Sequence, residues 1–285
     1  MGNYLCIDAG TSIIKVVVFD NNFKIKFKLS SPNKIITDNL GKSEIDMNLF
    51  WEITSKLIKK AIQKSNFKPK DIISVGITGN MVGVWPINAN GAPTRNAILW
   101  NDARSKNIFD SIKKSNSKIY ENIFELSGSI VQFGCTIPVI KWLEKNEKNK
   151  LAKTKYFLTC KDWLRFKLTN TINNDFTERA VGPGNIYTGE LSEKIFKLLK
   201  LNIKNFKKFP TIKNSDEIAG YITKSASSMT GIKEDTPVII GAGDVPATAI
   251  GVGAIKNGIT STIIGTTCHN YLVCDKPMFK PKNTG

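Results

Sequence analysis

Short runs of apolar residues open the chain and predict three β-strands. The runs cover residues 4–7, 13–19 and 23–29. The second is rich in Val and Ile, and the third alternates apolar residues with lysine, as a half-exposed strand does. The connections at 8–12 and 20–22 are short and polar. The pattern therefore predicts an antiparallel meander whose first turn contains glycine.

Helix and strand signals follow the meander. Leu49, Ile53, Leu57 and Ala61 recur at helical spacing after Asp46, a residue type that caps helix N-termini. Further strands are predicted at 72–78, 82–87, 97–100 and 238–240, a turn at 90–91, mainly helical structure from about 104 to 170, a small-residue helix at 246–253, and a hairpin at 261–264 and 271–274. A meander followed by strand and helix units predicts an α/β domain with a mixed sheet.

Residues 246–285 predict the beginning of a second unit. They contain signals for only one helix and one hairpin. An isolated hairpin is marginally stable in water, and its edges remain unpaired. We therefore expect a complete domain at 1–245 and an incomplete one at 246–285.

The chain carries a formal net charge of +17, which invites a nucleic-acid interpretation. Only Arg95, Arg104, Arg165 and Arg179 supply the planar guanidinium that phosphate and base recognition favours. Lysine is instead spread over the whole chain, which is typical of a solvated surface. No apolar run approaches the roughly 18 residues of a membrane span, and the N-terminus lacks a signal-peptide pattern. We expect neither nucleic acid nor membrane as a partner.

Histidine and cysteine usage narrows the chemistry. His269 is the single histidine, which excludes a histidine metal cluster and, elsewhere in the chain, a Ser-His-Asp triad. We expect it to be packed or hydrogen-bonded. The cysteines show no metal-binding spacing; they are Cys6, Cys135, Cys160, Cys268 and Cys274. An odd number of scattered cysteines is typical of the reducing cytoplasm.

Two glycine-containing turns could bind phosphate. In the first, Asp8 ends a strand before Gly10, Thr11 and Ser12, with Lys15 beyond. Glycine allows close backbone approach, and turn N–H groups can hold an anion. Asp8 would repel phosphate, so its natural role is to hold Mg²⁺. An ordinary hairpin turn explains this motif equally well.

The second such turn has Gly265 and Thr266 between two predicted strands. Together the two turns could hold a polyphosphate from both sides, although a simple hairpin is again the alternative. Asp244 follows the buried strand at 238–240 and precedes a helix. It could be a general base that accepts a hydroxyl proton, or the N-cap of helix 246–253.

Two segments could contact a substrate. Met81 and Val82 lie between glycines, so the backbone there is either exposed to a ligand or in a tight turn. Trp100 stands close to Asp102 and Arg104. An aromatic ring packs on the carbon–hydrogen faces of a sugar while polar groups bind its hydroxyls. The alternative is a helix cap at Asp102 with Trp100 in the core.

In their order along the chain, these segments resemble the FGGY family of carbohydrate kinases. The resemblance is carried by CIDAGTSIIKVVVFD, VGITGNMVG, GAPTRNAILWNDARS, KDWLRFKLTN with NNDFTERA, GAGDVPATAIGVGAIKNG and IIGTT. It implies an actin-like, ribonuclease-H-like fold with a truncated second domain. It also implies ATP-dependent phosphorylation of a sugar or polyol hydroxyl with ATP and Mg²⁺.

The resemblance also implies roles for individual residues. These are Asp8 for Mg²⁺, Gly10, Thr11 and Ser12 for the first phosphate turn, Gly265 and Thr266 for the second, Asp244 for the base, and Met81, Val82, Trp100 and Asp102 for the substrate. Xylulose kinases of the family usually have histidine where Val82 stands, and glycerol kinases have Arg-Glu at this pair. Val245 occupies a position that is commonly polar. A pentulose, a tetritol and another small polyol all remain open as substrates.

The chain is much shorter than family members usually are. The resemblance therefore predicts a cytoplasmic sugar kinase that forms a homodimer when full length. The alternative is a truncated, catalytically inactive fragment that binds sugar.

Overall fold

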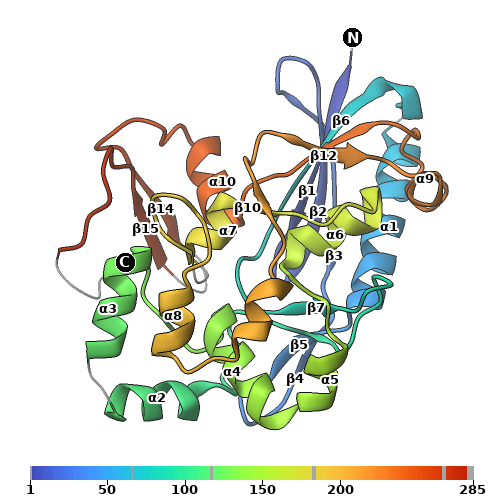
Figure 1. Cartoon of the computed structure of the whole chain (residues 1–285). Helices are drawn as coiled ribbons and strands as arrows, with labels where there is room; N and C mark the ends of the chain where they lie inside the picture. The colour runs from blue at the N-terminus through green and yellow to red at the C-terminus, as the bar shows by residue number, and fades with distance from the viewer. Residues whose placement is uncertain (1, 66, 116–117, 182–183, 265–267, 281–285) are drawn as a thin grey trace.

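A computed structural model describes residues 2–65, 67–115, 118–181, 184–264 and 268–280 (Figure 1). Its centre is a six-stranded mixed sheet in the order β12-β13-β6-β1-β2-β3. The strands are β1 (Asn3–Ala9), β2 (Ile13–Phe19), β3 (Ile25–Pro32), β6 (Ile72–Gly79), β12 (Ile218–Tyr221) and β13 (Pro237–Ile239). β1, β2 and β3 pair antiparallel, whereas β6 is parallel to both β1 and β13. The predicted meander and mixed sheet are confirmed.

Three helices that contact one another cover one face of this sheet. They are α1 (Met47–Lys64), α6 (Cys160–Thr169) and α9 (Lys224–Thr230). Helix α1 begins as predicted, because the Asp46 side chain accepts hydrogen bonds from the backbone N–H groups of residues 48 and 49. Leu5, Ile7 and Ala9 of β1 are buried on this face. Because side chains alternate along a strand, Asp8 points to the opposite, less buried face.

A second apolar core lies at the other end of the molecule (Figure 1). It is built from α2 (Lys106–Ser115), α3 (Lys118–Ser127), α4 (Thr136–Asn146), α5 (Lys148–Lys153) and α8 (Glu193–Leu198) together with two small sheets. The small sheets contain β4 (Ile35–Thr37), β5 (Ser43–Ile45) and β8 (Ala97–Ile98), and β7 (Trp85–Ile87) with β9 (Tyr156–Leu158). The chain also contains β10 (Asn174–Asp175), α7 (Phe176–Val181) and β11 (Ile212–Lys213). Turns of 3₁₀ helix occur at Pro69–Asp71 and Ile203–Lys208. The mainly helical region predicted from about 104 to 170 is confirmed, with β9 as the exception.

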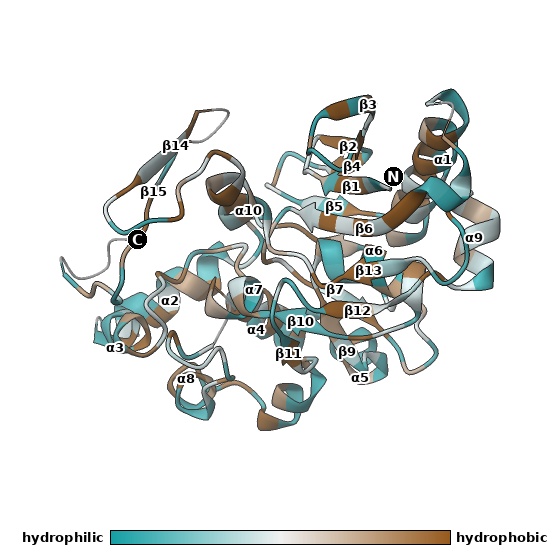
Figure 2. Ribbon diagram, turned by 90° about the horizontal axis from the view of Figure 1, so that it is seen from above, coloured by the Kyte–Doolittle hydropathy of each residue, from teal (hydrophilic) through white to brown (hydrophobic). Residues whose placement is uncertain are grey.

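The C-terminal segment contains α10 (Asp244–Gly251) and a hairpin of β14 (Thr260–Ile264) with β15 (Cys268–Leu272). In both ribbon views the hairpin lies on the opposite side of the molecule from β3 and α1 (Figures 1 and 2). Large apolar side chains are exposed here, including Ile250, Val252, Ile255, Ile264 and Leu272. The division into domains at 1–245 and 246–285 stays a prediction. No helix in the described part of the chain is both long and apolar enough to cross a membrane.

Some predicted boundaries were wrong for local reasons. The strand expected at 82–87 begins at Trp85, because Val82 and Gly83 have positive φ angles of 54° and 72°. The strand expected from 23 begins at Ile25, since Phe23 has a φ of 57°. The last strand ends at Leu272 rather than at 274. A backbone in the left-handed region cannot continue a β-ladder.

Candidate active site

Several of the predicted site residues lie on turns that follow three parallel strands. β1, β6 and β13 run in the same direction, so the turns that follow them share one edge of the sheet. The backbone N–H of Asn80 donates to the carbonyl of Ala9 over 3.0 Å, which ties the second turn to the first. A Cβ added to Gly243 would lie 2.5 Å from the sulfur of Met81. Glycine is therefore what lets the turn after β13 pack against residue 81.

The turn after β1 carries the predicted phosphate residues. Asp8 lies opposite Lys15 in the β1–β2 register, and their side chains form an ion pair of 2.8 Å. The side chains are 34% and 54% exposed, so this pair is at the surface. The indole Nε1 of Trp100 donates to Thr11 Oγ1 over 2.9 Å. This bond brings the predicted substrate loop to the predicted phosphate turn, which contains Gly10 and Ser12.

Asp244 lies across the same edge as the first residue of α10. Gly243 is the N-cap of this helix, so the alternative N-cap role for Asp244 was wrong. Burial, together with the nearby charge of Asp8, raises the pKa of the Asp244 carboxyl to about 6. His269 on β15 acts in the opposite direction. A carboxyl with this pKa can accept a proton near neutral pH and is a strong enough base to do so productively.

The turn that carries Asp244 is fixed by three side chains from other elements. The guanidinium Nη1 of Arg165 donates to the carbonyl of Ile240 over 2.7 Å. Thr78 Oγ1 donates to the carbonyl of Ala242 over 2.9 Å. The N–H of Gly243 donates to Thr177 Oγ1 over 3.0 Å. The backbone on the N-terminal side of Asp244 is therefore held from α6, from β6 and from α7.

The loop after β6 contains the predicted substrate pair. Val82 has a φ of 54°, a rare conformation for a β-branched residue. Its N–H donates to Glu178 Oε2 over 3.0 Å, and Thr136 Oγ1 donates to the carbonyl of Gly83 over 2.9 Å. Val82 is only 8% exposed, so its side chain adds little polar surface to the site. Backbone strain of this kind is concentrated at functional sites.

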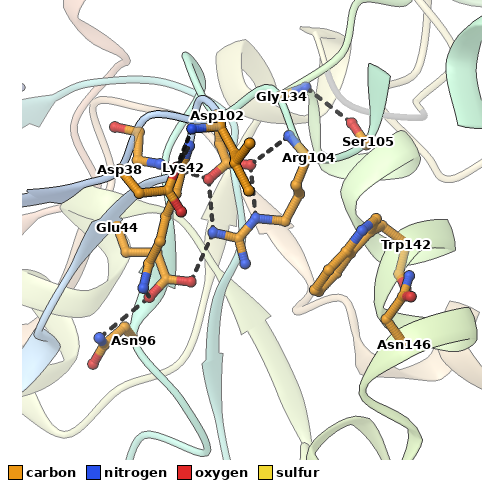
Figure 3. Close-up of polar contacts among 12 residues, drawn as sticks. Asp38, Lys42, Glu44, Asn96, Asp102, Arg104, Ser105, Gly134, Trp142 and Asn146 are labelled. Atoms are coloured by element: carbon orange, nitrogen blue, oxygen red, sulfur yellow. Dashed lines mark hydrogen bonds and ion pairs between the residues drawn. The ribbon is translucent and has the colours of Figure 1, made fainter. Parts of the chain in front are cut away.

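Trp100 and Asp102 are neighbours in sequence but have different environments. Trp100 is 37% exposed, so the alternative that placed it in the core was wrong. Asp102 is fully buried and accepts hydrogen bonds from Arg104 Nε at 2.7 Å and from the Ser43 N–H at 2.7 Å (Figure 3). Arg104 also reaches Glu44. Both Asp102 oxygens are thus occupied within the protein, an arrangement that favours a structural role for Asp102; direct contact with a substrate stays a prediction.

Gly265 and Thr266, predicted for the second phosphate turn, lie outside the described residues. The strands on either side, β14 and β15, form the predicted hairpin. We expected His269 to be packed or hydrogen-bonded. It lies instead on β15, a strand whose residues are all exposed, so it is not packed. It nevertheless acts on the Asp244 carboxyl, so β15 lies within electrostatic reach of the candidate base.

A buried ionic cluster lies behind the site, and none of its members has a predicted role. Lys161 pairs with Asp162 at 3.0 Å and with Asp175, and Arg165 pairs with Asp162 at 2.8 Å. All four side chains are completely buried. Charged residues are almost never fully buried unless they are paired. The signal available in the sequence was the concentration of charge in KDWLR, beside apolar residues of a helix that packs on the sheet.

Comparison with known proteins places this architecture in a family. A model of the N-terminal domain of the FGGY family of carbohydrate kinases matches residues 3–251. The chain belongs to the FGGY family of carbohydrate kinases. The family predicted from the sequence is therefore confirmed, and the mixed sheet is the core of its actin-like fold.

Curated relatives of this FGGY chain cover most of its length. The probable L-xylulose kinase of Haemophilus influenzae is 28% identical over 269 residues, which cover 93% of this chain and 54% of that protein. The xylulose kinase of Staphylococcus epidermidis is 30% identical over 270 residues, which cover 92% of this chain and 51% of that protein. The chain thus spans about half the length of the curated relatives it matches.

Solved structures show the same fold. The ligand-bound xylulose kinase of Lactobacillus acidophilus matches with a TM-score of 0.90 at 23% identity, covering 99% of this chain and 56% of that chain. The glycerol kinase of Plasmodium falciparum with ADP matches with a TM-score of 0.82 at 23% identity, covering 94% of this chain and 53% of that chain. In both cases the FGGY chain corresponds to about half of the solved protein.

Proposed function

We propose that the protein phosphorylates a hydroxyl group of a small sugar or polyol with ATP, and that Asp244 is the general base. The observation that supports this most is the raised pKa of Asp244, about 6, at a sheet edge shared with Asp8 and the phosphate turn. Family membership supports the same reaction class. A general base is most effective when its pKa lies close to the working pH.

In this mechanism Asp244 accepts the proton of the substrate hydroxyl. The hydroxyl oxygen forms a bond to the γ-phosphorus as the bond between that phosphorus and the β,γ-bridging oxygen breaks, and ADP leaves. Residues 10–12 orient the phosphates through their backbone N–H groups and hydroxyls. Lys15, on the same face as Asp8, adds positive charge close to them.

The first turn also fits Mg²⁺. Mg²⁺ binds through one or two carboxylates together with substrate phosphates and water, so a single half-exposed carboxylate such as Asp8 is a sufficient protein ligand. When bound, the ion would neutralise charge that develops on the phosphates. Asp8 would hold it, and Lys15 would exchange its carboxylate partner for phosphate.

The residues predicted to contact the substrate, Trp100 and Val82, favour a pentulose or a polyol of similar size. The exposed Trp100 ring offers a flat apolar surface, while Val82 lacks the polar side chain usual at this position in xylulose kinases. Two of the curated relatives are named as a probable L-xylulose kinase and a xylulose kinase. We expect a cytoplasmic enzyme that forms a homodimer when full length and that binds neither nucleic acid nor membrane.

The test measures sugar-dependent ADP release with a panel of pentuloses, tetritols and hexitols. ADP release is measured both for this chain and for the protein produced from the complete gene. Release of ADP that depends on one of these compounds supports the proposal. Absence of ADP release from the complete protein with every compound contradicts it.

A second candidate is a chain that binds sugar without turnover. It is favoured by one observation, namely that the chain spans only about half of its relatives. Calorimetry of the same chain with the same compounds distinguishes the two. Sugar binding by this chain without ADP release from it supports the second candidate.

A further inference from the structure

Two adjacent residues of α7 hold the two turns of the candidate active site. Thr177 Oγ1 accepts the N–H of Gly243 over 3.0 Å, next to the candidate base. Glu178 Oε2 accepts the N–H of Val82 over 3.0 Å, in the candidate substrate loop. These contacts join segments that are 66 and 96 positions apart along the chain. One short helix thus contacts both sides of the site.

Both turns need such support. Val82 holds a positive φ, a strained conformation for a β-branched residue that persists only where its surroundings fix it. The turn after β13 packs closely on the Met81 side chain, because a Cβ on Gly243 would lie 2.5 Å from its sulfur. The two turns are therefore in contact with each other. The relative position of substrate and base depends on both.

Thr177 is itself oriented from behind. Its hydroxyl donates to Asp175 Oδ2, which also accepts the Thr177 N–H at 2.8 Å and the Ser215 hydroxyl at 3.1 Å. Asp175 is ion-paired with the buried Lys161. Because the Thr177 hydroxyl donates to Asp175, its lone pairs remain free to accept the N–H of Gly243. The buried ionic cluster thus fixes the direction of the bond to the base turn.

Glu178 is held differently, with one oxygen left over. Its side chain is 3% exposed, and Oε1 has no hydrogen-bond partner among the residues that the structure describes. Thr159 Oγ1 and Asn174 Oδ1 are likewise without partners there, and all three atoms belong to residues that line one cavity. Lys161 already has two carboxylate partners. Burial raises the pKa of the Glu178 carboxyl well above its usual range.

We propose that Thr177 and Glu178 are positioning residues that keep the candidate base and the substrate loop in register, with Glu178 acting as a neutral acid. Oε2 accepts the Val82 N–H, and the proton on Oε1 is available to an acceptor in the cavity. A neutral side chain suits this place because the nearby Lys161 is already ion-paired with two carboxylates. The inference rests on the proposed function.

The experiment compares paired substitutions in the complete protein. Glu178→Ala removes the acceptor for Val82, so we expect the KM for sugar to rise about tenfold while kcat changes little. Thr177→Val removes the acceptor for Gly243, so we expect kcat to fall about tenfold while sugar affinity is kept. Glu178→Gln and Thr177→Ser preserve the acceptors, and we expect both to rescue these losses. Glu193→Ala, in an exposed ion pair on α8, is the matched surface control.

The outcomes separate this inference from the proposed function. Kinetics like those of the wild type in Glu178→Ala and Thr177→Val overturn the positioning roles. Loss in Glu178→Gln equal to that in Glu178→Ala overturns the neutral acid, as does a pH profile of Glu178→Gln that differs from that of the wild type. If Glu178→Ala or Thr177→Val does not fold, Glu178→Gln and Thr177→Ser still test the proposal. It requires that both of these variants retain the wild-type KM and kcat, and a change in either value contradicts it.

If the wild type releases no ADP with any sugar or polyol, the proposed function fails and calorimetry tests the inference alone. Glu178→Ala must then weaken sugar binding about tenfold relative to Glu178→Gln. Equal affinities of these two variants overturn the inference under that condition.

Discussion

The turn after β1 and the turn after β13 provide the two carboxylates of the candidate site, but they are built differently. Asp8 stands on a surface-facing strand position and is ion-paired with Lys15 at 2.8 Å. Asp244 is partly buried at a helix start and has no ion-pair partner among the described residues. Its pKa is raised to about 6 by burial and by Asp8.

The difference suits the two carboxylates to different tasks. A half-exposed carboxylate beside a cation can exchange that partner for a metal ion at little desolvation cost. A partly buried carboxyl with a raised pKa gains less by staying ionised and so takes up a proton more readily. The same residue type can therefore hold charge at one turn and move a proton at the next, which is a recurring pattern in enzymes with paired carboxylates.

The largest expected effect comes from Asp244→Asn. The amide cannot accept the hydroxyl proton, so kcat should fall by about a thousandfold, within the range for loss of a general base. Sugar affinity, measured by calorimetry, should be largely unchanged, because the side chain keeps its shape. Normal turnover in this variant would remove Asp244 from the mechanism.

A smaller loss is expected from Asp8→Asn. Removing this carboxylate should weaken Mg²⁺ binding and lower kcat/KM for ATP by about a hundredfold, with the sugar KM retained. Titration of activity with Mg²⁺ should show a higher half-saturating concentration than in the wild type. The comparison between the two turns fails if Asp8→Asn instead alters sugar affinity and leaves the Mg²⁺ dependence unchanged.

The pH profile tests how the two carboxylates are coupled. Asp244 must be deprotonated to act as a base, so kcat should fall below about pH 6, by about tenfold for each further pH unit. The negative charge of Asp8 is one cause of the raised pKa. Removing that charge should lower the pKa of Asp244, and the acid limb of Asp8→Asn should move to lower pH. A shift to higher pH would contradict the assigned coupling.

Local patterns in the sequence were sufficient for much of the fold and for part of the site. The apolar runs of β1 and β2, the Asp46 cap and the turn residues around Gly10 each act over a few positions, so they could be recognised directly. Family resemblance then supplied the candidate base. These features depend on neighbours along the chain.

The remaining features depend on contacts between distant segments. Val82 lies in a Val- and Gly-rich run that favours a strand, but Glu178 holds its N–H and the backbone turns. Asp102 has the same sequence neighbourhood as Trp100, yet it is buried and accepts the N–H of Ser43, which is 59 positions away. Neither partner could be identified from spacing alone, because the fold decides which distant groups meet.

The smallest expected effect concerns the bond that joins the first turn to the substrate loop. Trp100→Phe keeps an aromatic ring for the sugar but removes the Nε1 donor to Thr11. Trp100 is partly exposed, so water can replace this donor, and a loss of about threefold in kcat/KM is expected from one neutral hydrogen bond. The loss should appear in the KM for ATP, because Thr11 belongs to the phosphate turn.

Thr11→Val should cause a similar loss, and the double variant should lose no more than either single one. Additive losses would show that Trp100 and Thr11 act independently, so that the substrate loop does not support the phosphate turn.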